Sequence, residues 1–232
     1  MELVLDRFCA GYGAVAVVDR LSLSVAEGEA VVILGRNGMG KSTLLKGILG
    51  FLPGAKGSVR LGGQEIIGRP TNAIVRRGVA YAGQEGAVFG DLTVAENIEA
   101  GTLISHPGKA REQQIFDFFP VLKERRQQRA GTLSGGEQRM LALARVLLAS
   151  PKLIVLDEIS AGLQPAKVAE VEAALRWERC NRGTTILMVE QNLGLALALA
   201  SRIAVMKVGQ IVLEARADAV DIKSELMRQL AP

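Results

Sequence analysis

A glycine-rich octapeptide reads Gly35-Arg36-Asn37-Gly38-Met39-Gly40-Lys41-Ser42. The apolar run at 30–34 just before it has the length and the β-branched residues of a buried strand, and residues 43–49 just after it have helical spacing. Gly50 ends the predicted helix. Strand, glycine-rich loop and helix therefore follow one another in the order that a phosphate-binding loop requires.

The chemistry of this loop favours a triphosphate ligand. Glycines allow successive backbone N–H groups to turn inward, and the following helix adds the positive end of its dipole. Lys41 would reach the β- and γ-phosphates, and Ser42 would place its oxygen on a Mg²⁺ ion that bridges them. An ordinary glycine-rich turn before a helix is the alternative, but the complete G-x-x-x-x-G-K-S match in this context favours a nucleotide triphosphate site.

The composition is that of a globular protein with one full-sized core. Of the 232 residues, 49% are apolar and 22% are charged. The net charge of +4, from 28 basic and 24 acidic residues, is too small to indicate DNA or RNA as a partner. Cys9, Cys180 and the single histidine, His106, do not have the spacing of a zinc site, and two such cysteines fit a reducing compartment.

No targeting or membrane-spanning segment is expected. Residues 1–7 lack a basic start followed by an apolar stretch, and the apolar run at 140–148 carries Arg145 in its middle. We therefore expect the chain to be cytoplasmic, so that any association with a membrane depends on partner proteins.

The remaining pattern predicts an antiparallel layer, a parallel sheet and several helices. Short β patterns at 3–5, 21–25 and 58–61 predict the antiparallel layer, and the runs at 79–82, 152–156 and 184–189 predict buried strands covered on both faces. A closing hairpin is expected around Gly209. Helices are expected from Thr93, over 110–129 with an interruption at Pro120, from Ser134 to 148, over 165–182, and after Asp221.

Polar residues stand at the ends of three predicted buried strands. Gln84 follows the first, Asp157 and Glu158 end the second, and 190–192 follow the third. Ligands meet parallel sheets at such ends. Asp157 would hold Mg²⁺ and Glu158 would polarise the attacking water; chance or an N-cap is the alternative reading of the two carboxylates.

A second helix start has features that suit a phosphate. Ser134 and Glu137 form a predicted capping box, and Gly135 and Gly136 leave bare amides beside the serine hydroxyl at the helix N-terminus. The alternative is a well-capped helix and nothing else.

Three motifs together resemble the nucleotide-binding subunit of ABC transporters, and the match covers essentially the whole chain. They are the phosphate loop, Leu133-Ser134-Gly135-Gly136-Glu137, and the run at 153–158 that continues into Ser160-Ala161-Gly162-Leu163. The Leu-Ser-Gly-Gly-Glu element is the specific one, because a phosphate loop with an acidic strand occurs in many NTPases. Within the family, the stretches 36–40, 89–97 and 189–192 are similar to one of the two ATPase subunits of branched-chain amino-acid importers, and related amide and urea importers have similar subunits.

This resemblance implies an α/β fold: a P-loop NTPase (RecA-like) core, an N-terminal antiparallel β subdomain and an inserted α-helical subdomain. The whole chain, 1–232, would be one ABC ATPase domain. Residues 1–84 and 151–232 would form the nucleotide-binding core with the β subdomain, and 85–150 the helical subdomain that carries the signature motif.

The resemblance also implies ATP as ligand, Mg²⁺ as its metal and ATP hydrolysis as the activity. The residues implied to bind ATP are Tyr12, Gly35, Arg36, Asn37, Gly38, Met39, Gly40, Lys41, Ser42, Thr43, Ser134, Gly135, Gly136 and Glu137. Those implied to act in hydrolysis are Lys41, Gln84, Glu158 and Gln191, and those implied to hold Mg²⁺ are Ser42, Gln84 and Asp157. Tyr12 would stack on adenine, with packing within its glycine turn as the alternative role.

The implied direct partners are transmembrane permease subunits and a second ABC ATPase subunit, which is either the same chain or a related one. A solute-binding protein would be an indirect partner, and no nucleic acid is implied. Residues 134–136 would close over ATP held by the second subunit, 160–163 would cross the interface between the two, and 85–94 would lie against the permease. The chain would thus be peripheral on the inner face of the cell membrane.

Three positions depart from the common pattern of the family. Gln191 stands where most members have histidine, although glutamine is usual in the subgroup named above, and Ile159 and Gly83 stand where proline is common. The alternatives to a branched-chain amino-acid importer are another ABC transporter, for urea or amide import or for export, and a soluble ABC ATPase of DNA repair or translation. The last class needs a long coiled-coil insert or two cassettes in one chain, and the sequence has neither.

Overall fold

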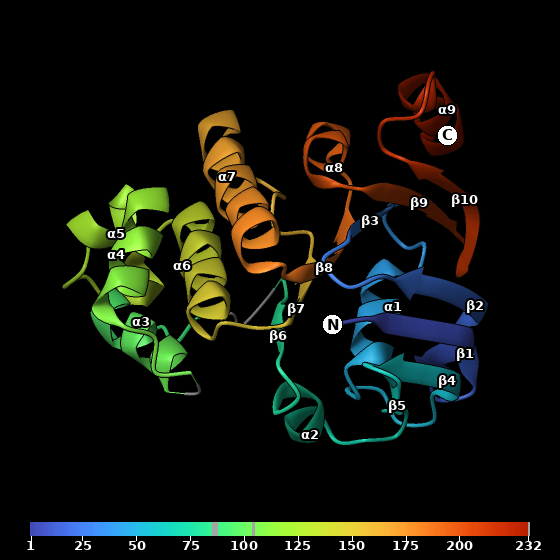
Figure 1. Cartoon of the computed structure of the whole chain (residues 1–232), viewed down its shortest axis with the longest axis horizontal. Helices are drawn as coiled ribbons and strands as arrows, with labels where there is room; N and C mark the ends of the chain where they lie inside the picture. The colour runs from blue at the N-terminus through green and yellow to red at the C-terminus, as the bar shows by residue number, and fades with distance from the viewer. Residues whose placement is uncertain (85–87, 104, 232) are drawn as a thin grey trace.

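Two β-sheets carry the fold in the structure, a computed structural model that describes residues 1–84, 88–103 and 105–231 (Figure 1). The larger sheet has six strands in the order β10-β9-β3-β8-β7-β6. All of its neighbours pair in parallel except β10, which forms an antiparallel hairpin with β9. The strands are β3 (Ala30–Leu34), β6 (Val79–Ala82), β7 (Leu153–Asp157), β8 (Thr185–Glu190), β9 (Arg202–Lys207) and β10 (Gln210–Arg216). The predicted parallel sheet and closing hairpin are confirmed.

The smaller sheet is antiparallel and has the order β2-β1-β4-β5. Its strands are β1 (Leu3–Tyr12), β2 (Val15–Val25), β4 (Lys56–Leu61) and β5 (Gln64–Glu65). The antiparallel layer was therefore predicted correctly, but β1 extends further than the β pattern at 3–5. Tyr12, expected within a glycine turn, is the last residue of β1 and pairs with Val15.

Alternation along β3 explains how both faces of the larger sheet are covered. Val32 and Leu34 point into one hydrophobic cluster, with the helices α6 (Gly135–Leu148), α7 (Pro165–Arg182) and α8 (Leu193–Leu199). Val31 and Ile33 point into a second cluster, which α1 (Lys41–Ile48) shares with the antiparallel sheet. The continuous apolar strand therefore reflects burial on both sides.

The helical segment between β6 and β7 lies at the end of the molecule away from the antiparallel sheet (Figure 1). It contains α3 (Val94–Thr102), α4 (Lys109–Phe118), α5 (Pro120–Glu124), a 3₁₀ turn at Ala130–Thr132 and α6. Thr93 and Ser134 both form complete capping boxes, as predicted.

The stretch 110–129, expected to be mostly helical with an interruption at Pro120, contains α4 and α5, but the expectation is wrong for residues 125–129. Its last residues turn away from helical geometry because their carbonyls accept from the start of α3: the amide of Val94 donates to the carbonyl of Gln128, and the amide of Ala95 to that of Arg126. The strand-like bridge between Thr93 and Arg129 continues this pairing. Pro120 begins α5, as its position after a helix end favours.

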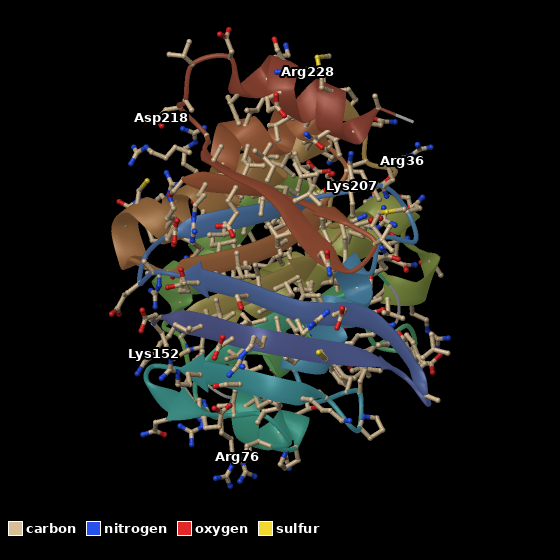
Figure 2. All side chains as sticks on the ribbon, turned by 90° about the vertical axis from the view of Figure 1, so that its right-hand side faces the viewer. Arg36, Arg76, Lys152, Lys207, Asp218 and Arg228 are labelled. Atoms are coloured by element: carbon tan, nitrogen blue, oxygen red, sulfur yellow. The ribbon has the colours of Figure 1, made fainter. Side chains whose placement is uncertain are left out.

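Two short helices complete the described chain. α2 (Thr71–Val75) precedes β6, and α9 (Ile222–Leu230) follows the hairpin, as expected after Asp221. Within the described ranges, no helix has the length and apolar character needed to cross a membrane. Figure 2 views the molecule from the side of the antiparallel sheet, with Arg36 and Lys207 at one edge and the C-terminal helix above them.

Candidate nucleotide-binding site

The predicted polar strand ends gather at one edge of the larger sheet. The phosphate loop follows β3, Gln84 follows β6, Asp157 ends β7, and Gln191 follows β8. Because these strands are parallel neighbours, their carboxyl ends lie at the same edge. The sheet therefore brings together residues that lie far apart in the sequence.

Two glycines of the phosphate loop are required by its geometry. Gly35 passes so close to β9 that a Cβ there would lie 2.7 Å from the carbonyl oxygen of Met206. Gly40 is the N-cap of α1 with φ 97°, a left-handed conformation that side chains rarely adopt. The loop can therefore turn tightly from strand to helix with its amides exposed to a ligand.

Lys41, the first residue of α1, is buried, with 4% of its surface exposed. Its Nζ donates to the carbonyl oxygens of Gly35, at 2.7 Å, and Arg36, at 3.0 Å. It also forms an ion pair with Glu158 Oε1 at 3.0 Å. The amino group thus connects the phosphate loop to the end of β7, which is where a γ-phosphate would need positive charge.

Ser42 and Asp157 form the second connection between these elements. The Ser42 hydroxyl donates to Asp157 Oδ1 at 3.0 Å. Burial raises the pKa of Asp157, and the charge of neighbouring Glu158 adds to this, while the Ser42 hydrogen bond opposes it. Asp157 and Glu158 therefore have different partners, as expected for adjacent carboxylates at a strand end.

The oxygen donors around Ser42 fit a Mg²⁺ ion. Ser42, Asp157 and Gln84 line one pocket of about 560 Å³, and hydroxyl, carboxylate and amide oxygens are the hard ligands that Mg²⁺ prefers. No group of three or more His, Cys, Asp or Glu that could hold a metal occurs among the described residues, so this set would need phosphate oxygens and water to complete an octahedron. That requirement matches a metal that arrives with a nucleotide.

Glu158 has an unusual backbone for its residue type. Its φ is 50°, in the left-handed region, and its amide donates to the carbonyl of Val189 at 2.9 Å. The residue before a proline is restricted to extended conformations, so isoleucine at position 159 permits a backbone that proline would disfavour. Such strain is common where a side chain must be aimed at a reacting group.

The space around Gly83 explains why glycine stands where proline is common in the family. A Cβ at this position would lie 2.6 Å from the Tyr81 hydroxyl, so glycine leaves room for the tyrosine ring. Burial, followed by the charge of Asp157, raises the pKa of the Tyr81 phenol. Gly83, at a position where proline is common in the family, therefore leaves room for the Tyr81 phenol beside Asp157, the candidate metal ligand.

Tyr12 stands at the rim of the same pocket. Its side chain is half-exposed, at 52%, and it lines the pocket with Ser42, Gln84 and Asp157. An exposed ring at the mouth of a pocket is free to stack on a base. Lys46, one helical turn after Ser42, lines it too and was not singled out from the sequence; the spacing of four residues along α1 was the available signal.

One residue of the phosphate loop, Asn37, contacts Gln191. Gln191 Nε2 donates to Asn37 Oδ1 at 2.7 Å. A pocket of about 270 Å³ is lined by Lys41, Glu158 and further predicted residues: Asn37, Gly38, Gly40, Ser42, Thr43 and Gln84. Arg36 and Met39 instead line a neighbouring pocket of about 240 Å³ against the end of α9.

The predicted residues at the start of α6 do not join this group. Ser134, Gly135, Gly136 and Glu137 line a separate pocket of about 530 Å³, together with Gly162 and Leu163. No residue of 35–43 lines it, whereas Gln84 lines this pocket and both pockets near Ser42. Within one chain, the predicted nucleotide-binding residues therefore form two sets.

Comparison with known proteins gives concordant matches. A family model described as "ABC transporter" matches residues 18–161. The high-affinity branched-chain amino acid transport ATP-binding protein BraG of Pseudomonas aeruginosa is 40% identical over 213 residues, which are 91% of this chain and 91% of BraG. The probable branched-chain amino acid transport ATP-binding protein LivF of Archaeoglobus fulgidus is 36% identical over 213 residues, 90% of this chain and 89% of that protein. Among solved structures, a nucleotide-free ATP-binding cassette from an ABC transporter has a TM-score of 0.84 and 27% identity, and the match covers 97% of this chain and 95% of that one.

Proposed function

The chain belongs to the ABC transporter family, and from this premise we propose that it is the ATP-hydrolysing subunit that powers an importer of branched-chain amino acids. The names of BraG and LivF, at 40% and 36% identity over about nine-tenths of the chain, support this substrate class. The observation that carries the catalytic part is the pair of contacts Lys41–Glu158 and Ser42–Asp157, which join the phosphate loop to the end of β7.

These contacts suit an exchange with ATP. Lys41 Nζ, now bonded to two loop carbonyls and Glu158, would turn to the β- and γ-phosphates. Glu158 would then be free to orient and polarise the attacking water. Ser42, Gln84 and Asp157 would hold Mg²⁺, which neutralises charge on the phosphates when bound.

The separation of the two nucleotide-binding sets supports a site that needs two ATPase subunits. Residues 134–136 of one subunit would cover ATP held by Lys41 of the other, and 160–163 would lie between them. The partner is a second copy of this chain or a related ATPase. ATP would close the pair, and loss of the γ-phosphate contacts would open it.

The coupling to a membrane is part of the same proposal. Residues 1–84 and 151–232 would form the nucleotide-binding core with the β subdomain, and 85–150 would form a helical subdomain that transmits motion to permease subunits at the inner face of the membrane. The expected permease contact at 85–94 lies partly outside the described residues, at 85–87. A solute-binding protein would act on the far side of the permease.

Matched N-cap variants test the two-subunit site. Ser134→Ala and Thr93→Ala each remove one capping box, so each should cost α6 or α3 about 1 kcal/mol of stability. Only Ser134→Ala should also reduce ATP turnover and ATP-dependent dimerisation, measured by phosphate release and by light scattering. Equal turnover in the two variants, or full activity in a strictly monomeric Ser134→Ala protein, would contradict the proposal.

The substrate class needs its own experiment. The ATPase should be reconstituted with the permease subunits and the solute-binding protein encoded beside it, and assayed with leucine, isoleucine, valine, urea and short amides. Stimulation of ATP hydrolysis by the branched-chain amino acids alone is the expected result. Stimulation by urea or amides instead would place the chain in the related importers, and the absence of any such permease or binding protein would favour an exporter or a soluble ABC ATPase.

A further inference from the structure

Glu190, at the end of β8, is a buried carboxylate that has no role in the site described so far. Only 1% of its surface is exposed. Oε1 accepts from the Ser160 amide at 2.9 Å, and Oε2 accepts from the Ser160 hydroxyl at 2.8 Å. Oε2 also accepts from the amides of Gln191, at 3.2 Å, and Asn192, at 3.4 Å. Within the described part of the chain, no lysine or arginine forms an ion pair with it.

These bonds tie together two loops that come from different strands. Ser160 belongs to the turn that follows Glu158 after β7, and Gln191 begins the loop after β8. The first loop continues to Leu163, which lines the pocket at the start of α6. The second presents Gln191 to Asn37 of the phosphate loop. One carboxylate therefore holds the loop that reaches the pocket at the start of α6 and the loop that contacts Asn37 of the phosphate loop.

We propose that Glu190 is a positioning residue that locks the loop at 158–163 to the loop at 191–192, so that Gln191 and residues 160–163 keep a fixed position relative to each other. The proposal rests on the proposed ATPase function and adds to it the element that sets the relative position of Gln191 and residues 160–163. A shift of the loop at 158–163 would break two buried hydrogen bonds to this carboxylate, and a shift of the loop at 191–192 would break two partly buried ones; such bonds are costly to leave unmade.

The donors around Glu190 make a conservative substitution informative. All four contacts are N–H or O–H groups that donate to its oxygens. Burial raises the pKa of the carboxyl, but the Ser160 and Asn192 donors oppose that shift by favouring the charged form. In Glu190→Gln the side chain keeps its shape, but one oxygen becomes an NH₂ group that would face another donor. The lock should therefore fail without a change in volume.

Glu65 supplies a matched control in the antiparallel sheet. Its carboxylate likewise accepts from a serine hydroxyl, that of Ser58, and from two backbone amides, those of Val59 and Ile67. It lies on β5, away from the residues that line the nucleotide pockets. Glu65→Gln should therefore loosen only its own surroundings.

Amide hydrogen exchange without nucleotide tests the lock directly. Glu190→Gln should accelerate exchange at 160–163 and 191–192 by about tenfold or more, since local opening becomes easier, while β3 and the antiparallel sheet stay protected. Glu65→Gln should leave these segments unchanged. Unchanged exchange at 160–163 in Glu190→Gln would overturn the proposal.

Steady-state ATP hydrolysis then separates positioning from stability. Per folded protein, Glu190→Gln should lower kcat about tenfold with KM for ATP changed by less than about threefold, because it misplaces groups used after binding. Ser160→Ala should lower kcat less, and the double variant should be no worse than Glu190→Gln alone, since both remove one connection. A kcat equal to that of Glu65→Gln would show that Glu190 has a structural role only, and this would overturn the inference. If the wild-type chain has no ATPase activity, the proposed function is refuted. The exchange experiment then decides by itself whether Glu190 locks the loops.

Discussion

Neutralising Glu158 separates binding from chemistry in this site. Lys41 Nζ lies 3.0 Å from Glu158 Oε1, and only 4% and 9% of the two side chains are exposed. The Glu158→Gln substitution keeps the shape of the side chain and a hydrogen-bond acceptor. It removes the negative charge that competes with phosphate for Lys41 and that would activate the attacking water.

The two effects have different sizes. Hydrogen bonds that involve a charged group contribute about 1.5–3 kcal/mol. Lys41 stays charged in the variant, so its bond to position 158 falls from the upper to the lower end of that range, and Lys41 should be released to ATP more easily by up to about 1.5 kcal/mol. This corresponds to an ATP affinity that is unchanged or up to about tenfold higher. Loss of a general base should lower kcat by about 10²–10⁴-fold, which is about 2.7–5.4 kcal/mol of barrier.

Calorimetric titration with Mg·ATP measures the first effect, and phosphate release measures the second. Glu172→Gln is a suitable control, because Glu172 forms an exposed ion pair with Arg176 on α7 and should leave both quantities unchanged. Turnover within twofold of wild type in Glu158→Gln would refute the assignment of the base. A loss of ATP affinity would refute the argument that Glu158 competes for Lys41.

Three further outcomes follow from contacts elsewhere in the chain. Arg111→Met should cost up to about 3 kcal/mol in urea unfolding, because it removes the nearest partner of buried Glu178 and leaves only the longer ion pair with Arg182, at 3.6 Å. Arg176→Met, at an exposed pair, should cost less than about 1 kcal/mol. Gly40→Ala should weaken ATP binding about five- to thirtyfold in calorimetry, since a left-handed residue costs roughly 1–2 kcal/mol at the loop itself. Gly54→Ala, also left-handed but in open space, should lose a similar amount of stability and no ATP affinity. Burial raises the pKa of the Glu178 carboxyl above its ordinary 4.5 in the folded protein. The stability that this carboxyl contributes is therefore fully present below pH 4.5 and is lost as the pH rises through the folded-state pKa. Glu178→Gln should flatten that part of the pH profile of the unfolding free energy.

Local sequence signals predicted most of the architecture. Each of these signals favours a local structure that is present in the fold: the run at 30–34 forms a strand, Thr93 and Ser134 cap helices, and proline begins α7. The error at 125–129 has a different origin: those residues are good helix formers, but backbone bonds to the start of α3 override their propensity. Propensity carries no information about such a distant partner.

The site was predictable as a set of residues but not as an arrangement. Glycine spacing and polar strand ends identified Lys41, Ser42 and Asp157, because each signal lies within a few residues. The sequence could not show that Glu190 bonds to Ser160, thirty residues away, since that contact depends on β7 and β8 being parallel neighbours. The same limit applies to the division of the predicted nucleotide-binding residues into two sets.

The contacts within the phosphate loop also bear on how ATP energy would be used. In this structure the groups that would hold ATP are already bonded to protein: Lys41 to loop carbonyls and Glu158, Ser42 to Asp157, and Gln191 to Asn37. The loop is therefore already ordered, and ATP binding would exchange one set of hydrogen bonds for another with little further loss of loop entropy. Part of the gross interaction with the phosphates would offset the contacts that are lost. Under the proposed two-subunit site, the pocket at the start of α6 would supply further contacts to ATP held by a second subunit.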